Sequence, residues 1–449
     1  MRVFTKLHDK KLIPERCSCI SCLTLSCSSD TLINGYIHHV SGHDFERYHN
    51  LENGVQDDMQ IQKLTADDFE PAMALSEYAF QMVMSEEQTE KRRSQFDSQD
   101  IWGVFEEGQL GAKLHIIPFQ TYIHGRSFEM GGIAGVATWP EYRRKGWVAG
   151  LLKHALEEMN RNKQSISFLH PFSFAFYRKY GWETYVEFKR YRVPTAHLPA
   201  KKVTSGTIRR GNPGLSIFKE VYGAYAERYN GTLIRDDARW ENSVLTNGTR
   251  QKAVYYDEAG KAQGYILYEV KERKFTIKEI IYLNEEARQG LWTFIANHDS
   301  MIEEVTLQAP ASDLLAFQLD NPRIQQEIVP FFMARIVSVE QFISQYPFTN
   351  PDSPLQITLQ VEDAYAPWNE GVWQLNVAMN GTASIWKTSE PGAQDHIVKV
   401  DIQALTAILM GYRRPTEMAQ IGRIEGPTGA IKALEQAVPK RETYLLDFF

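Results

Sequence analysis

The sequence predicts an α+β protein of several domains. Short apolar runs typical of strands are separated by one long amphipathic helix pattern and by shorter helical stretches. A similar order of strands and helix recurs later in the chain. A length of 449 residues also exceeds what one hydrophobic core usually holds. We therefore expect two copies of one mixed domain, followed by a smaller α+β domain.

The composition is that of a folded protein and argues against several functions. Apolar residues make up 43% and aromatic residues 12% of the chain, which suffices for packed cores. The net charge of −7 does not favour a sequence-independent grip on nucleic acid. The chain has no apolar run long enough for a membrane span and no apolar stretch typical of a signal peptide. We expect a cytoplasmic protein.

Residues 1–58 differ from the rest of the chain because they hold all of its cysteines. Thiolates and imidazoles are the usual ligands of zinc, but the spacing here lacks the paired cysteines of known zinc sites. The interpretation we favour is an unstructured or mis-assigned extension ahead of Met59. We expect no metal and no disulfide in the remainder. The residues concerned are Cys17, Cys19, Cys22, Cys27, His38, His39, His43 and His49.

The first domain is expected over residues 59–200. It starts with a helix whose capping residues are Thr65 and Asp68. Strands are then expected at 101–105, 110–119 and 128–138, a helix from Val148 and a short strand at 165–169. A helical stretch through Tyr177 and a strand at 183–193 follow. The helix pattern is the clearest in the chain, with apolar residues at Val148, Leu151, Leu152, Ala155, Leu156 and Met159.

The loop before that helix carries the chemistry that we predict for this domain. Arg143, Arg144 and Lys145 place three positive charges where a strand ends and a helix begins. Gly146 lets the backbone approach a phosphate closely, and the free amides of a first helical turn attract anions. Such a loop suits a pyrophosphate. The alternative is a solvated basic loop without function.

A second copy is expected over residues 201–345. Residues 285–292 lie 144 positions beyond residues 141–148 and share a glutamate, an arginine and a glycine with them. Most of the basic residues are missing from this copy, so we expect it to be structural. Residues 346–449 should form the smaller domain, with a hairpin at Asn380-Gly381 and a helix over 428–438. Trp368, Trp373 and Trp386 are expected in its core.

The loop Arg143 to Gly146 resembles the coenzyme A loop of the GNAT N-acetyltransferase superfamily, although Val148 stands where that pattern has a third small residue. Residues 176–182, Phe-Tyr-Arg-Lys-Tyr-Gly-Trp, are similar to another motif of the superfamily. Two such domains followed by a sterol-carrier-like domain resemble the enhanced intracellular survival (Eis) family. Segments 332–337, 364–373 and the ending Asp-Phe-Phe449 are similar to that family too.

The resemblance implies a mechanism with acetyl-CoA as co-substrate. Backbone groups of Val136 and Thr138 would bind the pantetheine arm, and the loop would bind the pyrophosphate. Tyr177 would protonate the departing thiolate, and the terminal carboxylate of Phe449 would accept the proton of the amine. The cofactor-binding residues expected are Val136, Thr138, Arg143, Arg144, Lys145, Gly146, Trp147 and Val148.

The family's acceptors are polycationic small molecules such as aminoglycosides, and its members are homohexamers. The resemblance therefore implies a small-molecule amine acceptor and a homo-oligomer. Two alternatives stay open: acetylation of lysines in proteins or peptides, and a non-catalytic protein that binds lipid or coenzyme A. An intact basic loop and Tyr177 favour an enzyme.

Overall fold

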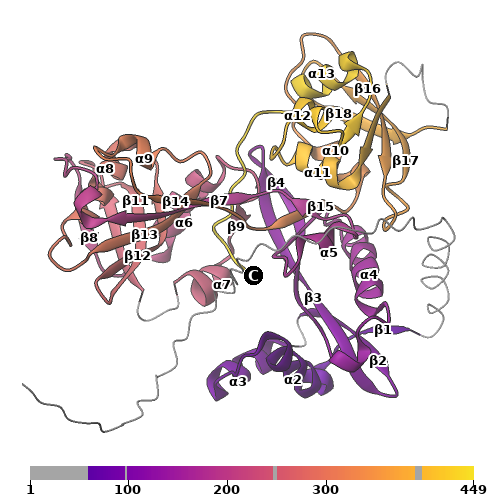
Figure 1. Ribbon diagram of the computed structural model, residues 1–449, viewed down its shortest axis with the longest axis horizontal. Coiled ribbons are helices and arrows are strands. Elements are labelled where there is room, and N and C mark those ends of the chain that lie inside the picture. Colours follow the sequence, from indigo (N-terminus) through magenta and orange to yellow (C-terminus); the bar gives the residue numbers. More distant parts are fainter. Residues whose placement is uncertain (1–58, 97–98, 246–249, 390–396) are drawn as a thin grey trace, which may run out of the picture. The chain divides into compact units, whose positions relative to one another are not determined.

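The computed structural model describes residues 59–96, 99–245, 250–389 and 397–449 (Figure 1). The cysteines and histidines of residues 1–58 lie outside the described residues. The described chain forms three β-sheets with helices packed on them, which confirms the expected α+β class.

The first sheet has the strand order β1-β2-β3-β4-β5-β15-β6, with β9 paired to β3. The strands expected at 101–105, 110–119, 128–138 and 165–169 are present, and β3 and β4 form a long hairpin through His124-Gly125. The bounds are β1 (Gln60–Lys63), β2 (Asp100–Glu106), β3 (Gln109–Ile123), β4 (Arg126–Thr138), β5 (Ile166–Leu169), β6 (Glu183–Thr184), β9 (Leu233–Ile234) and β15 (Met333–Ile336).

The strands β4 and β5 separate part of the way along. They pair in parallel only from Met130 to Ile133, opposite Ile166 to Leu169. Beyond this point β4 keeps its partner β3, with a bulge between the pairs Ala134–His115 and Ala137–Lys113. Gly135 lies in the bulge with a φ of 58°, a left-handed conformation that glycine adopts readily. The second half of β4 therefore has a free edge on the β5 side.

Helices cover both faces of this sheet. In α4 (Trp147–Arg161) the expected apolar stripe is buried except for Val148, which is half-buried, and it packs on the face that carries Leu114 and Ile133. On the other face α2 (Phe69–Phe80) begins after Asp68, whose carboxylate accepts a hydrogen bond from the Thr65 amide at 2.8 Å. The further helices are η1 (Ala66–Asp68), α3 (Glu86–Gln95), η3 (Pro140–Tyr142), α5 (Phe174–Arg178) and η4 (Thr195–His197).

The second sheet repeats this plan with the order β14-β7-β13-β12-β11-β10-β8. Its strands β12 and β13 pair in parallel over only three residues, as β4 and β5 do over four. The bounds are β7 (Glu187–Pro194), β8 (Thr207–Arg210), β10 (Gln251–Tyr256), β11 (Ala262–Lys271), β12 (Lys274–Tyr282), β13 (Glu304–Pro310) and β14 (Gln325–Pro330). Its helices are α6 (Leu215–Ala226), α7 (Asp237–Arg239), η5 (Trp240–Val244), α8 (Glu285–Ala296) and α9 (Leu315–Gln318).

The two sheets exchange strands. The strand predicted over 183–193 is divided at residues 185–186, and its larger part, β7, belongs to the second sheet. In return, β15 follows the strands of the second sheet in the sequence but lies between β5 and β6 of the first sheet. The domain boundaries expected near residues 200 and 345 stay a prediction. They describe the order of the domains in the sequence, whereas in space each of the two sheets includes a strand from beyond its own sequence range.

The third sheet, in the order β18-β17-β16-β19-β20, belongs to the C-terminal region. The hairpin expected at Asn380-Gly381 joins β17 and β18. Trp373 is buried as expected, whereas Trp386 is exposed because its ring lies on the outer face of a strand at the sheet edge. The bounds are α10 (Val339–Gln345), β16 (Leu355–Glu362), β17 (Gly371–Val377), β18 (Ala383–Lys387), β19 (Ile397–Asp401), α11 (Ile402–Leu409), α12 (Pro415–Gln420), β20 (Ile424–Glu425) and α13 (Thr428–Ala437).

Candidate active site

The basic loop lies at the start of α4, as expected. Gly146 is the N-cap residue with a φ of 80°, and Arg144 also has a positive φ, of 66°. Left-handed residues this close together make the chain turn sharply just before the first turn of α4. No heavy atom lies within 4 Å of the position that a Cβ on Gly146 would take. The space next to Gly146 is thus open.

The three basic side chains of the loop differ in their surroundings. Arg143 and Arg144 are exposed, and neither forms an ion pair with another described residue. In contrast, the Lys145 ammonium lies 2.9 Å from a Glu106 carboxylate oxygen and over the ring of Tyr142. The charge of Lys145 is therefore partly neutralised, and the two arginines carry the free positive charge of the loop.

The remaining residues predicted to bind the cofactor lie along the same path. Val136 follows Gly135 in the bulge of β4, and Thr138 ends the strand opposite Ala112. The ring of Trp147 is buried and stacks on Tyr142 with 4.6 Å between the ring centroids. Trp147 thus anchors the first turn of α4 in the core.

Tyr177 is buried beside the point where β4 and β5 separate. It belongs to the same apolar cluster as Ile133 and Leu169, the last residues of the paired stretch. Its hydroxyl accepts or donates no hydrogen bond among the described residues, and it is not one of the fully enclosed polar atoms. Burial raises the pKa of Tyr177, so the phenol stays protonated at neutral pH.

Phe449, the last residue of the chain, reaches the opposite face of β4. Its ring packs on Phe119 and Phe332, with centroids 4.8 Å and 4.9 Å away. A Cβ added to Gly132 would lie 2.7 Å from the Phe449 ring. Neighbouring residues of a strand point to opposite faces of a sheet. Phe449 on Gly132 and Tyr177 near Ile133 therefore approach β4 from its two sides.

Buried ion pairs hold the C-terminal tail in this place. Both Arg235 and Arg239 bind the carboxylate of Asp447, at 3.0 Å and 3.1 Å. Arg239 also donates a hydrogen bond to the Phe448 carbonyl at 2.6 Å. Arg235 binds Glu279 at 2.6 Å as well. Local sequence patterns do not reveal these arginines, because they lie more than 200 positions from Asp447, and the only signal is the apolar ending itself.

Comparisons with known proteins agree with this geometry. Models of the acetyltransferase (GNAT) domain match residues 60–185 and 231–336, and a model of the sterol carrier protein domain matches residues 339–446. A solved structure from Enterococcus faecalis, described as a probable N-acyltransferase, is 31% identical in sequence. It covers 87% of this chain and 100% of its own, with a TM-score of 0.82. The chain belongs to the GNAT acetyltransferases.

Two further relatives are similar to this acetyltransferase over most of its length. A GCN5-related N-acetyltransferase from Anabaena variabilis is 25% identical, with a TM-score of 0.78 over 87% of this chain and 100% of its own. An uncharacterized N-acetyltransferase of Streptomyces coelicolor is 21% identical over 67% of this chain and 76% of its own. The protein is thus an enzyme with two GNAT domains followed by a sterol-carrier-like domain, and GNAT domains imply acetyl-CoA as co-substrate.

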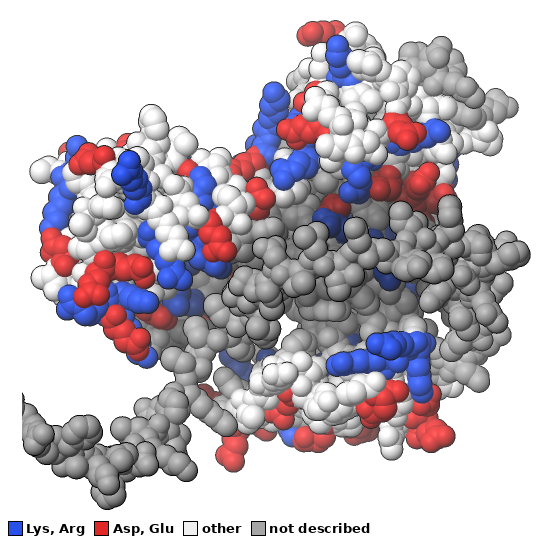
Figure 2. Space-filling view, viewed as in Figure 1, with Lys and Arg blue, Asp and Glu red and all other residues white. Residues whose placement is uncertain are grey.

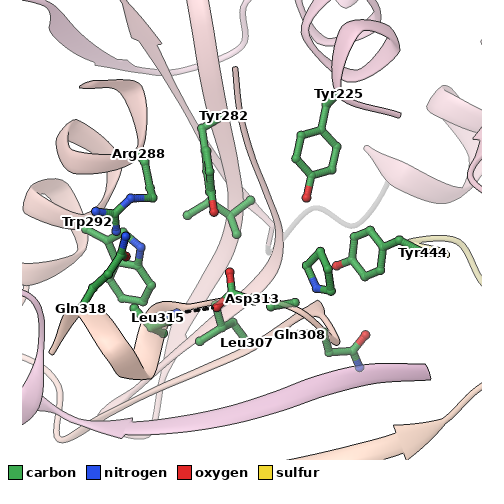
Figure 3. Close-up of a pocket in the computed structure, with 13 residues that line it drawn as sticks. Tyr225, Tyr282, Arg288, Trp292, Leu307, Gln308, Asp313, Leu315, Gln318 and Tyr444 are labelled. Carbon is green, nitrogen blue, oxygen red and sulfur yellow. Dashed lines mark hydrogen bonds between the residues drawn. The ribbon is translucent and has the colours of Figure 1, made fainter. Parts of the chain in front are cut away.

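In the second GNAT domain of the acetyltransferase, β12 and β13 also separate after a short paired stretch. Side chains fill most of the space between them. Figure 3 shows Tyr225, Tyr282 and Tyr444 pointing toward one space beside Asp313 and Arg288. The cavity left among them is about 30 Å³, which is room for little more than water. That the second copy is structural stays a prediction.

The expected alignment of the two loops was wrong in detail. Gly146 precedes α4, whereas Gly290 lies inside α8, where a Cβ would come 2.4 Å from the ring of Tyr255. Helix α8 begins earlier because the Asn284 side chain accepts a hydrogen bond from the Ala287 amide. Arg288 pairs with Glu285 of the same helix at 2.6 Å. In this copy a capped helix thus stands where the first copy has its basic loop.

The acetyltransferase has an open pocket of about 210 Å³ lined in part by Phe119 and Arg239, two residues that contact the Phe449 ring. Its lining includes two carboxylates and two arginines. Glu129 and Asp236 line it together with Arg235 and Arg239, and these arginines are bound by Asp447 and Glu279. Counted together, these four carboxylates and two arginines give the surroundings of the pocket a net negative charge.

The remaining expectations concern metals, membranes and nucleic acid. No group of three or more metal-binding side chains occurs among the described residues. In the same part of the chain, no helix is long and apolar enough to cross a membrane. Figure 2 shows basic and acidic side chains intermingled over the second domain, without a continuous basic face in that view.

Proposed function

We propose that this acetyltransferase transfers the acetyl group of acetyl-CoA to a primary amine of a polycationic small molecule, of which aminoglycosides are one type. The observation that carries the substrate class is the acidic pocket beside Phe449, since a cationic amine is attracted to it. The observation that carries the cofactor is the loop with Arg143, Arg144 and Gly146.

The loop would bind the pyrophosphate of acetyl-CoA through its amides and its two free arginines. The pantetheine arm would follow the free edge of β4 past Thr138 and Val136. The acetyl carbonyl would accept a hydrogen bond from a backbone amide near Val136, which stabilises the negative charge of the tetrahedral intermediate.

The terminal carboxylate of Phe449 would remove the proton of the acceptor amine. An ordinary alkylammonium of pKa about 10.4 costs roughly 4 kcal/mol to deprotonate at neutral pH, so a proton acceptor is needed. Supporting this role, the tail is anchored at Asp447 by Arg235 and Arg239, and the Phe449 ring packs on Gly132. A tail held in this way is unlike a frayed terminus.

Tyr177 would protonate the thiolate of coenzyme A as it leaves. A phenol kept neutral by burial has its proton available at neutral pH. The approach of Tyr177 and Phe449 from opposite faces of β4 suits a reaction in which thiol and amine lie on the two sides of the carbonyl carbon.

Membership of the Eis family, a homohexamer and a cytoplasmic location belong to the same proposal. The fold of Eis1 from Mycobacterium abscessus supports the family likeness, with a TM-score of 0.72 at 17% identity over 87% of this chain and 100% of its own. The mass of the particle in solution, measured by light scattering, tests the hexamer.

The deciding experiment measures thiol release from acetyl-CoA with aminoglycosides, polyamines and lysine peptides as acceptors. Two variants serve as controls: Tyr177→Phe, and a chain extended by one glycine after Phe449. The proposal requires turnover with the cationic small molecules and its loss in both variants. Preference for lysine peptides would favour a protein acetyltransferase. Coenzyme A binding without any turnover would favour the non-catalytic alternative.

A further inference from the structure

Lys113 of β3 is a buried lysine that has no partner among residues 59–96, 99–245, 250–389 and 397–449. Its exposed fraction is 6%, and its ammonium forms no hydrogen bond or ion pair with any described residue. The nitrogen is nevertheless not among the fully enclosed polar atoms. An unpaired buried cation costs several kcal/mol and is rare in structural positions.

The amine of Lys113 lies beside the bulge of β4. The Nζ atom is 3.8 Å from the position that a Cβ on Gly135 would take, and Gly135 precedes Val136. Lys113, His115 and Phe119 alternate along β3 and therefore share one face of the sheet. This is the face on which the Phe449 ring packs. Lys113 thus stands on the side from which the acceptor amine is proposed to come.

Charged groups around Lys113 favour its free amine. Burial, and then Arg92 of α3, lower the pKa of the Lys113 ammonium to about 8. On the same strand, burial and the charge of Lys113 lower the pKa of His115 to about 4, so His115 is neutral. On β2, Asp100 is paired with Lys63 at 2.5 Å. At neutral pH the share of free amine on Lys113 is roughly 200 times that of an ordinary lysine.

We propose that Lys113 is a site of self-acetylation, at which the enzyme transfers an acetyl group from acetyl-CoA to its own Nζ when no acceptor is bound. Desolvation next to a second cation is a known way of activating a lysine as a nucleophile. The inference rests on the proposed binding of acetyl-CoA along β4.

The reaction needs no further reagent. The free amine of Lys113 attacks the thioester carbonyl carbon, a C–N bond forms and the C–S bond breaks. The sulfur leaves with the bonding electron pair, and the proton lost by the nitrogen ends on the thiolate. The products are N-acetyl-Lys113 and coenzyme A. The acetyl group removes the positive charge from the acceptor face of the sheet.

The test incubates the full chain with acetyl-CoA and no amine, and maps acetylated peptides by mass spectrometry over time. We expect one acetyl group per chain at Lys113, at least tenfold faster than at exposed Lys145, with a rate that rises to a plateau above pH 8. Acetic anhydride serves as the matched control, because a reagent that needs no binding site should modify exposed lysines first. In the wild type, each chain should release one thiol from acetyl-CoA before turnover begins. The variant Lys113→Arg should not release this thiol.

Calorimetric titration with coenzyme A separates the two proposals. If coenzyme A binds and Lys113 stays unmodified, the self-acetylation is wrong while the proposed cofactor site stands. If coenzyme A does not bind, both are wrong. Equal acetylation of Lys113 and Lys145 would also overturn the inference, since it would show that bound acetyl-CoA does not direct the reaction to Lys113.

Discussion

The ring of Phe449 lies so close to Gly132 of β4 that a methyl group at Gly132 would stand 2.7 Å from it. The chain end is therefore seated on the central strand of the first sheet, more than 300 positions away in sequence. Glycine is required at this position because of the close approach, since the strand itself would accept any β-forming residue.

The seat of the terminal residue can be tested by Gly132→Ala. The added methyl group must displace the rings of Phe449 and Phe119, which would stand 2.7 Å and 2.9 Å away. We expect kcat to fall at least tenfold while coenzyme A binding in calorimetry is retained. Gly223→Ala is the matched control, because nothing lies within 4 Å of its Cβ position. Unchanged kcat in Gly132→Ala would argue against a role for the terminal carboxylate.

Asp447→Asn should release the tail. The Asp447 carboxylate is buried between two arginines, and removal of one partner from a buried ion pair costs about 3–5 kcal/mol. We expect a lower melting temperature in calorimetry together with loss of acetyl transfer. Glu327→Gln breaks an exposed pair with Arg190 and should cost less than about 1 kcal/mol. Equal effects of the two substitutions would contradict this account of the anchor.

The two arginines of the loop should matter more than the lysine. Arg143→Ala and Arg144→Ala are expected to raise the KM for acetyl-CoA about tenfold each, since each removes a charge-assisted contact to phosphate. Lys145→Ala should raise it less than threefold, because Glu106 already pairs with Lys145. Measurements at several salt concentrations check the electrostatic origin, since added salt should shrink the differences. A larger effect of Lys145→Ala than of the arginine substitutions would show that Lys145, and not the two arginines, contributes most to binding acetyl-CoA.

Tyr177→Phe should lower kcat about 100-fold and leave the KM for acetyl-CoA nearly unchanged, because only the proton donor is removed. Burial raises the pKa of Tyr177, so its proton is not lost in the working range. We therefore expect the pH profile of the wild type to show no fall between pH 8 and 10 from this residue. A variant that retains full kcat would reduce Tyr177 to a packing role.

His124 should make the protein less stable in acid. Burial, and then Arg441, lower the pKa of His124 from 6.5 to about 4. The unfolded chain binds the proton more readily, so stability is complete above pH 6.5 and falls as the pH drops toward 4. The loss from this residue is of order 3 kcal/mol. Chemical denaturation of wild type and His124→Gln at pH 7 and pH 4.5 measures it; equal pH dependence in the two proteins would contradict the prediction.

Local sequence patterns predicted the elements that bury an apolar stripe or end in a characteristic turn. The helix with Leu151, Leu152 and Leu156 and the hairpin at Asn380-Gly381 are confirmed. Helix α3 was missed because its residues are polar and none is buried, so it has no periodic signal. The split of the strand over 183–193 was missed as well, because pairing partners, which local patterns do not contain, decide which sheet a strand joins.

By itself the sequence determined the two-copy plan and the basic loop with Gly146 before α4, and it predicted roles for Tyr177 and the terminal residue. These follow from local spacing and turn chemistry, which act between near neighbours in the chain. Only the tertiary structure decided that Asp447 binds Arg235 and Arg239, that Phe449 lies on Gly132, and that Lys113 faces Gly135. Such contacts depend on which sheets and loops pack together. A buried charge needs a partner nearby in space, and that partner can lie at any distance along the chain.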